Sequence, residues 1–219
     1  MKDYLLIFAD RWNDLLNAVI QHLILSLAAV LLGCIVAIPL GVFLSKTSIH
    51  WLRTLSFTIT NIFQTIPSLA LLAILIPLIG IGTTPAIVAL FLYSLMPILR
   101  NTYSGFQSID PDIIEAARGM GYSPRQTLVK IELPLAVPYI MAGIRLTTVY
   151  IISWATLATL IGAGGLGQLI VGGLAVYDKP LIFASAVLAM VLALIIDFLL
   201  SVLEKSISKR THTETNQSI

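Results

Sequence analysis

The stretch from Ile113 to Pro134, IIEAARGMGYSPRQTLVKIELP, is the only long polar interruption between apolar stretches in this sequence. Signals for the start of a helix occur twice around it. Asp110 is a good N-cap with Pro111 at the first helical position, and Ser123 followed by Pro124 repeats the pattern. We therefore expect two short helices here, within a polar loop that covers residues 108–134.

The residues that follow each start agree with this interpretation. Gly119 and Gly121 can end the first helix. Gln126 stands three residues after Ser123, which is the spacing of a capping box. Pro134 disfavours a helical conformation in the residue before it and is expected to mark the return of the chain to the membrane. A helix-turn-helix with capped starts is a structured segment, and such segments commonly dock a partner.

The composition predicts an integral membrane protein. Of the 219 residues, 58% are hydrophobic and only 11% are charged, and the mean hydropathy is +0.95. Soluble domains carry about 25% charged residues, so this chain has too little polar surface to cover a globule in water. The single cysteine, Cys34, lies in an apolar run and is expected to be a small apolar filler.

Five apolar stretches predict an all-α fold with five transmembrane helices. A spanning helix needs about 20 predominantly apolar residues, and the third stretch reaches that length only with the polar residues 101–104. The predicted spans are Leu23–Leu44, Leu55–Ile79, Ala86–Leu99, Ile144–Ile161 and Leu181–Leu203. They form a membrane domain over residues 23–204.

The two ends of the chain are expected to lie outside this domain. Residues 1–22 have a helical rhythm of apolar residues that includes Trp12, which suits an amphipathic helix on the extracytoplasmic surface or one packed into the core. Residues 205–219 are expected to be a disordered cytoplasmic tail.

The orientation of the chain follows from its basic residues. With the polar loop in the cytoplasm, Lys2, Arg11 and Lys179 are the only lysines and arginines on the outer side. This bias of basic residues predicts an external N-terminus and a cytoplasmic C-terminus.

Polar residues inside the second span are candidates for the substrate path. Asn61, Gln64, Thr65 and Ser68 surround Pro67, and polar groups at membrane depth face either protein or water. Hydrogen bonding around a helix kink is the alternative.

Two charged residues and one row of small residues also stand out. Arg145 and Asp197 fall toward the same side of the fourth and fifth spans, so we expect either an ion pair or an arginine that reaches to the membrane surface.

Small residues recur every fourth position in the first span and predict close helix packing, within the chain or against a second copy. They are Ala29, Gly33, Ala37 and Gly41.

Motifs of soluble enzymes and metal proteins are not supported. No G-x-x-x-x-G-K-[ST] motif occurs, so the sequence predicts no P-loop. Residues 162–167 fit G-x-G-x-x-G, but they connect two spans, and we expect a flexible external loop near the substrate entrance. The histidines do not cluster with acids or with cysteine, so neither a metal nor another cofactor is predicted.

The polar loop has the spacing EAA, three residues, G, nine residues, I, one residue, LP. This pattern resembles the coupling loop in permease subunits of bacterial ABC importers. Residues 64–82, 85–105 and 159–167 are similar to permeases of osmoprotectant importers, which move glycine betaine, carnitine, choline or proline betaine. Methionine importer permeases share the motif and the glycine-rich segment. The matching motif positions are Glu115, Ala116, Ala117, Gly121, Ile131, Leu133 and Pro134.

The resemblance implies a type I ABC importer permease rather than an enzyme. It implies that the chain lies in the lipid bilayer of the bacterial cytoplasmic membrane. The implied partners are two ATPase subunits that receive the coupling helix, a second permease, identical or paralogous, and an extracellular binding protein. No nucleic acid partner is implied. An ion-coupled secondary transporter is the alternative from a different class, and a methionine or other amino-acid importer is the alternative within the family.

Overall fold

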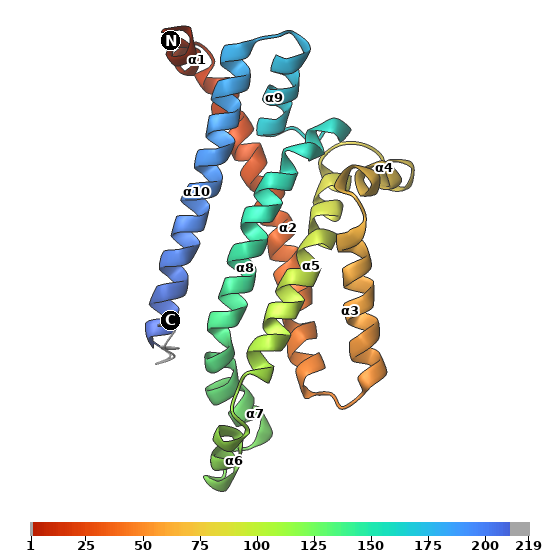
Figure 1. Cartoon of the computed structure of the whole chain (residues 1–219), viewed down its shortest axis with the longest axis vertical. Coiled ribbons are helices and arrows are strands. Elements are labelled where there is room, and N and C mark those ends of the chain that lie inside the picture. Colours follow the sequence, from red (N-terminus) through yellow and green to blue (C-terminus); the bar gives the residue numbers. More distant parts are fainter. Residues whose placement is uncertain (1, 211–219) are drawn as a thin grey trace.

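The computed structural model describes residues 2–210, with side chains described from Leu6 to Ile207. All regular elements in this part of the chain are helices (Figure 1), which confirms the predicted all-α fold. They are α1 (Lys2–Asp10), α2 (Trp12–Lys46), α3 (His50–Thr65), α4 (Ser68–Ile79), α5 (Thr83–Gln107), α6 (Pro111–Gly119), α7 (Pro124–Thr127), η1 (Leu128–Glu132), α8 (Leu133–Ala155), η2 (Leu157–Ile161), α9 (Leu166–Ala175) and α10 (Lys179–Arg210).

Four continuous helical segments are long and apolar enough to cross a membrane. They are α2, α5, the segment Pro124–Ala155 and residues Lys179–Ile207 of α10. The third predicted span does take in residues 101–104, because α5 runs to Gln107. A fifth crossing needs α3 and α4 together, and these two helices meet at an angle of 99°. The described residues therefore hold four helical segments long enough to cross a membrane, and a fifth crossing if the bent pair α3 and α4 counts as one broken span.

The break in the second predicted span lies at Ile66 and Pro67. Ile66 adopts an extended conformation with φ −67° and ψ 128°, as expected for a residue before proline. The hydroxyl of the buried Tyr93 donates a hydrogen bond to the Ile66 carbonyl at 2.7 Å. This bond satisfies a backbone acceptor that the break leaves free, and α4 consequently lies across one end of the bundle (Figure 1).

Helix α5 packs against both α2 and α8, and α2 passes obliquely behind the other two helices in Figure 1. The small-residue face of α2 is buried against α5. A Cβ atom added to Gly41 would lie 2.8 Å from Cβ of Thr102, and one added to Gly33 would lie 2.0 Å from Oγ of Ser94. A Cβ on Gly143 of α8 would lie 2.6 Å from Cβ of Asn101. The small residues thus allow close packing within the chain on both sides of α5.

The N-terminal region differs from its expected organisation. Residues 2–10 form the separate helix α1, whereas residues 12–22 of the expected N-terminal helix belong to the long helix α2, which begins at Trp12. Leu15 and Ala18 are buried, and Ala18 packs in one cluster with Leu166 and Leu192. Part of the apolar rhythm therefore reflects packing against α9 and α10, whereas Trp12 is exposed.

The C-terminal region also differs. Helix α10 continues through residues 205–210, so the expected disordered tail does not begin at residue 205. Residues 211–219 of that expected tail, with His212, lie outside the described residues.

The glycine-rich segment is not a flexible loop. Gly162, Gly164 and Gly165 have φ values of +77°, +82° and +78°, which form a tight turn before α9. Ala163 is buried within this turn, and the backbone N–H of Gly165 donates to Oε1 of Gln21 at 3.1 Å. The turn is therefore fixed on α2. The prediction of a flexible loop was wrong here, because glycine content alone does not distinguish a mobile loop from a turn that requires positive φ.

The close contact of α2 with α5 predicts a stability effect. Gly41→Ala is expected to lower the free energy of unfolding by about 1–3 kcal/mol, because the new methyl group overlaps Thr102. Gly172→Ala in α9 is the matched control, since a Cβ there has no neighbour within 4 Å. Thermal unfolding of the detergent-solubilised protein measures both. Equal stability of the two variants would show that the α2–α5 contact tolerates more volume than its geometry indicates.

Candidate functional site at the polar loop

The two predicted helix starts in the polar loop are present with their caps. The Asp110 side chain accepts a hydrogen bond from the backbone N–H of Asp112 at 2.9 Å. Oγ of Ser123 accepts from the N–H of Gln126 at 3.3 Å, and Oε1 of Gln126 accepts from the N–H of Ser123 at 2.8 Å. Because these side chains satisfy backbone groups at both starts, the loop is a fixed structural unit.

The turn between α6 and α7 is a Schellman motif centred on Gly121. The N–H of Tyr122 donates to the carbonyl of Ala117 at 3.1 Å, and the N–H of Gly121 donates to the carbonyl of Arg118 at 2.9 Å. Gly121 has φ +83°, a conformation that most side chains disfavour. The motif glycine is therefore required by backbone geometry and not by space, because a Cβ there would meet no atom within 4 Å.

The EAA residues divide between two faces of α6. Ala117 is fully buried, whereas Glu115 and Ala116 are exposed. Glu115 lines a shallow groove of about 650 Å³ together with Pro111 and Arg118. It makes no hydrogen bond or ion pair with any residue that the structure describes. Ala117 thus holds α6 in place, while Glu115 and Ala116 face outward at the end of the bundle (Figure 1).

The second helix of the polar loop does not end at Pro134. Helix α7, the π-helical turn η1 and α8 form one continuous helix from Pro124 to Ala155. The N–H of Leu133 donates to the carbonyl of Leu128, five residues earlier. We attribute the continuity to this wider π-helical turn, which directly precedes Leu133 and Pro134. Leu133 is helical despite the proline that follows it, contrary to the local expectation, while α8 itself begins at Leu133, next to the predicted point of return.

The last three motif residues lie in this continuous helix. Ile131, Leu133 and Pro134 are all half-buried. Leu133 packs against a cluster that includes Phe106 and Ile109 at the end of α5. These residues therefore attach the polar loop to the bundle and do not present a free surface.

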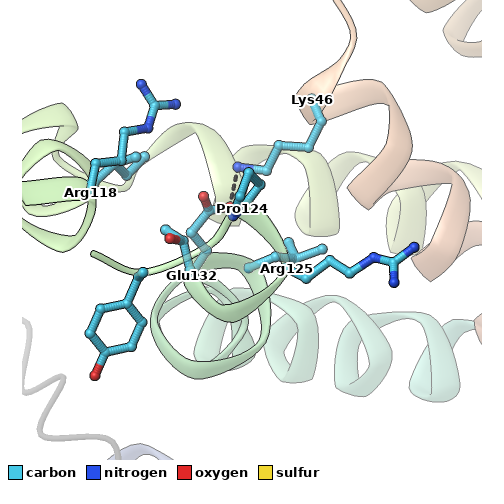
Figure 2. A pocket seen from close by; sticks show the side chains of 9 residues that line it. Lys46, Arg118, Pro124, Arg125 and Glu132 are labelled. Atoms are coloured by element: carbon cyan, nitrogen blue, oxygen red, sulfur yellow. Dashed lines mark ion pairs between the residues drawn. The ribbon is translucent and has the colours of Figure 1, made fainter. Parts of the chain in front are cut away.

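An ion pair between Lys46 and Glu132 joins the polar loop to α2 (Figure 2). Glu132 in η1 is only 4% exposed, and Lys46 is in the last turn of α2. The Lys46 ammonium also lies 5.6 Å from the centre of the Phe106 ring in α5. Lys46 and Glu132 both line a pocket of about 430 Å³ at the base of the polar loop. One cation therefore contacts α5 and η1 from the end of α2.

Sequence reasoning missed this contact. Glu132 occupies the variable position of the I-x-LP motif, and nothing local connects it with a lysine in the first span. The available signal was chemical: a carboxylate between two apolar residues, Ile131 and Leu133, becomes buried only if a cation reaches it.

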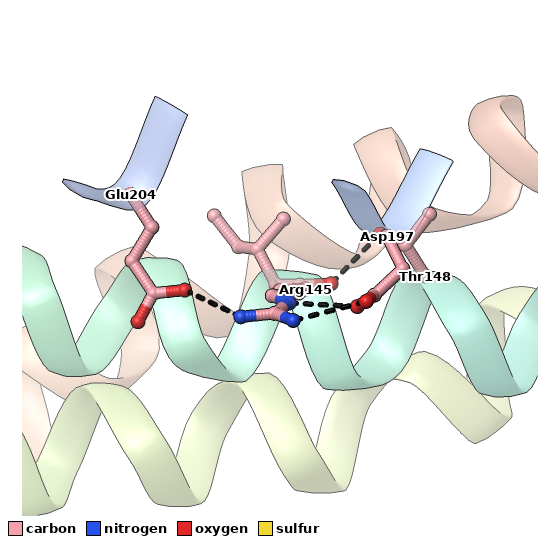
Figure 3. Close-up of polar contacts among 5 residues, drawn as sticks. Arg145, Thr148, Asp197 and Glu204 are labelled. Atoms are coloured by element: carbon pink, nitrogen blue, oxygen red, sulfur yellow. Dashed lines mark hydrogen bonds and ion pairs between the residues drawn. The ribbon is translucent and has the colours of Figure 1, made fainter. Parts of the chain in front are cut away.

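Arg145 and Asp197 lie together between α8 and α10 (Figure 3). The Arg145 Nε and Nη2 atoms donate to Oδ1 and Oδ2 of Asp197 at 2.7 and 2.9 Å. Nη1 also donates to Oε2 of Glu204 at 3.3 Å, a partner that the sequence analysis did not include. This bidentate contact, with a second acid beside it, joins α10 to the middle of α8.

The four candidate path residues do not form one cluster. Asn61 lines a groove between α3 and α5. Gln64 and Ser68 are half-buried on opposite sides of the break, and the Thr65 hydroxyl donates to the Ile62 carbonyl at 2.9 Å. Thr65 thus makes the local hydrogen bond near the kink that was the alternative to a role in the substrate path. Asn61, by contrast, lines a groove.

The chain belongs to the family described as the binding-protein-dependent transport system inner membrane component, whose model matches residues 37–209. It is therefore a transport component, a permease subunit of an ABC transporter.

Individual proteins similar to this chain are also permeases or transporters. The chain is 45% identical over 212 residues to the carnitine transport permease protein OpuCB of Listeria monocytogenes, covering 96% of this chain and 95% of that protein. It is 48% identical over 196 residues to the choline transport system permease protein OpuBB of Bacillus subtilis, covering 90% and 89%. Among solved structures, an inward-facing MetNI methionine ABC transporter matches with a TM-score of 0.81 and 27% identity, covering 90% of this chain and 98% of that chain.

The Lys46–Glu132 ion pair predicts an asymmetric response to substitution. Lys46→Met is expected to destabilise the protein by about 2 kcal/mol, because it leaves a buried carboxylate without a cation. Glu132→Gln is expected to cost less, since the partly exposed lysine can reach water. The double variant Lys46→Met with Glu132→Gln should recover most of the loss. Hydrogen exchange of residues 108–134 and thermal unfolding measure these effects, and a double variant no more stable than Lys46→Met would contradict the pairing.

Proposed function

We propose that this chain is the permease subunit of an ATP-driven importer that carries compatible solutes such as glycine betaine, carnitine or choline. The observation that carries this proposal is the polar loop, which presents Glu115 and Ala116 at the end of the bundle on a capped framework. The carnitine and choline permeases that match nearly the whole chain support the solute class. The lower identity to the methionine transporter favours this class over a methionine importer.

A separate ATPase subunit is the proposed partner of the polar loop. Exposed Ala116 allows close approach of another surface, and the unpaired Glu115 offers a carboxylate to a basic residue. Two such ATPases, a second permease and an external binding protein complete the proposed assembly. A chain in this family whose loop is built to dock a partner is better explained by ATP-driven import than by ion-coupled transport.

The attachment of the polar loop suggests how a partner's movement would reach the spans. The loop continues directly into α8, reaches α5 through a short connection at residues 108–110, and pairs with α2 through Lys46. A displacement of the loop by the ATPases would therefore move three packed helices together. In the proposed cycle this movement switches the path between inward-facing and outward-facing states.

The proposed orientation places the polar loop in the cytoplasm. The connection between α2 and α3 and the C-terminal end of α10 lie at the same end as the loop, whereas α1, α4 and α9 lie at the other (Figure 1). Basic residues concentrate at the loop end, as the positive-inside rule requires of a cytoplasmic face. The N-terminus would then be external and the C-terminus cytoplasmic.

The proposed docking predicts that changes on the exposed face of α6 uncouple the importer. Glu115→Lys is expected to reduce uptake of labelled solute by about tenfold or more, because it reverses a charge at the contact. Cells that express the permease with its ATPase and binding protein provide the assay, and Glu115→Gln, which removes charge without reversing it, should lose less. Gly121→Val should also fail, whereas Gly121→Asn, which tolerates positive φ, should retain more activity.

Co-purification separates docking from folding. The Glu115→Lys permease should reach the membrane in normal amounts but retain less ATPase subunit. Normal uptake together with normal retention of the ATPase subunit in the Glu115→Lys variant would contradict the docking proposal. Uptake of none of the three solutes by the unaltered complex would instead reject the proposed solute class.

A further inference from the structure

A groove of about 450 Å³ between α3 and α5 contains two arginines, and none of the residues that line it is acidic. Arg53 comes from the first turn of α3, and Arg100 from α5, about two turns before the end of that helix at Gln107. The groove therefore lies toward the end of the bundle that carries the polar loop (Figure 1). Asn61, one of the candidate path residues, also lines it.

Arg53 is held in position by neighbouring side chains. Its Nη1 donates to the Tyr103 hydroxyl at 3.0 Å, and its Nη2 donates to Nδ1 of His50 at 2.6 Å. Tyr103 is itself packed edge-to-face against Phe57, with ring centres 5.3 Å apart. A guanidinium has five N–H donors, so these two bonds leave donors for a further acceptor. Arg53 is thus a pre-oriented cation and not a freely moving surface side chain.

Arg100 lies beside it without a partner. It is exposed, stands three residues before Tyr103 on the same face of α5, and forms no ion pair or hydrogen bond with any residue that the structure describes. Lys46 and Arg145, by contrast, each contact a carboxylate. Charged residues in spans normally pair or face a water-filled path, so the groove carries positive charge that an anionic group would neutralise.

We propose that this groove is a subsite for the carboxylate of a zwitterionic solute, at the inner end of the transport path. The inference rests on the proposed function, because the path must carry compatible solutes. Glycine betaine and carnitine each have one carboxylate and one quaternary ammonium group, whereas choline has the ammonium group and a hydroxyl in place of the carboxylate. Arg100, with Arg53 beside it, would attract the two carboxylated solutes by charge-assisted hydrogen bonds and would offer choline nothing equivalent.

The test compares the three solutes in the same complex. Arg100→Gln should lower the maximal uptake rate of glycine betaine and carnitine by about three- to tenfold, while choline uptake changes by less than about twofold. Arg100→Lys, which keeps the charge, should restore most of the difference. Lys205→Gln, at the same end of the bundle, is the control for loss of one basic residue. ATP hydrolysis and the amount of assembled complex are measured for each variant.

The outcomes distinguish the subsite from other roles of the two arginines. An equal fall for all three solutes would show that Arg100 supports the fold or the membrane position, and would overturn the proposal. Unchanged rates for all three would overturn it as well, and so would a complex that transports only choline. If the complex transports only the carboxylated solutes, the proposal requires loss in Arg100→Gln and recovery in Arg100→Lys.

Reconstitution addresses a lipid phosphate, the other oxyanion that such a groove could hold. The Arg100→Gln and unaltered complexes are compared in vesicles of phosphatidylcholine alone and of phosphatidylcholine with phosphatidylglycerol. A carboxylate subsite predicts the same selectivity change in both vesicles. An effect that appears only with phosphatidylglycerol and is equal for all three solutes would overturn the proposal in favour of a lipid contact. Absence of uptake in the unaltered complex would reject the proposed function itself.

Discussion

The ion pair between Lys46 and Glu132 is the contact on which the arrangement of the polar loop depends. A carboxylate that is 4% exposed needs a cation, and the only one it contacts among the described residues comes from the end of α2. That requirement fixes α2 against the π-helical turn η1, while Phe106 places the end of α5 beside the same ammonium. The polar loop is therefore bound to three helices at its base, although its outer face is free.

The packing above this base explains why a bound loop would matter. Helix α5 is held closely between α2 and α8, because Gly41 and Gly143 leave no room for larger side chains. Close-packed helices of this kind move as a body more readily than they deform. The outer helix α10 is attached differently, through Arg145 to Asp197 and Glu204. A movement at the polar loop would thus be transmitted to α2, α5 and α8 by close helix packing. It would be transmitted to α10 by the ion pairs of Arg145.

Four basic residues of the long helices fall into two kinds that differ in their surroundings. Lys46 and Arg145 have carboxylate partners and join helices. Arg53 and Arg100 share a groove that no acid lines, and only Arg53 is held by neighbours. A positive-inside bias accounts for the location of Lys46, Arg53 and Arg100 toward the loop end, but not for this division. Their contacts suggest structural roles for the first pair and a binding role for the second.

The class of protein, the all-helical fold and the caps of the polar loop were predictable from the sequence. These follow from local chemistry: apolar length, the hydrogen-bonding side chains of Asp110, Ser123 and Gln126, and the positive φ that suits Gly121. The packed helices were needed to show that α4 turns by 99° from α3, that the helix continues past Pro134, and that Lys46 reaches Glu132. Each of these depends on contacts between residues distant in sequence or on a wider helical turn. Local propensity does not encode such contacts, because their energy arises only when the helices pack.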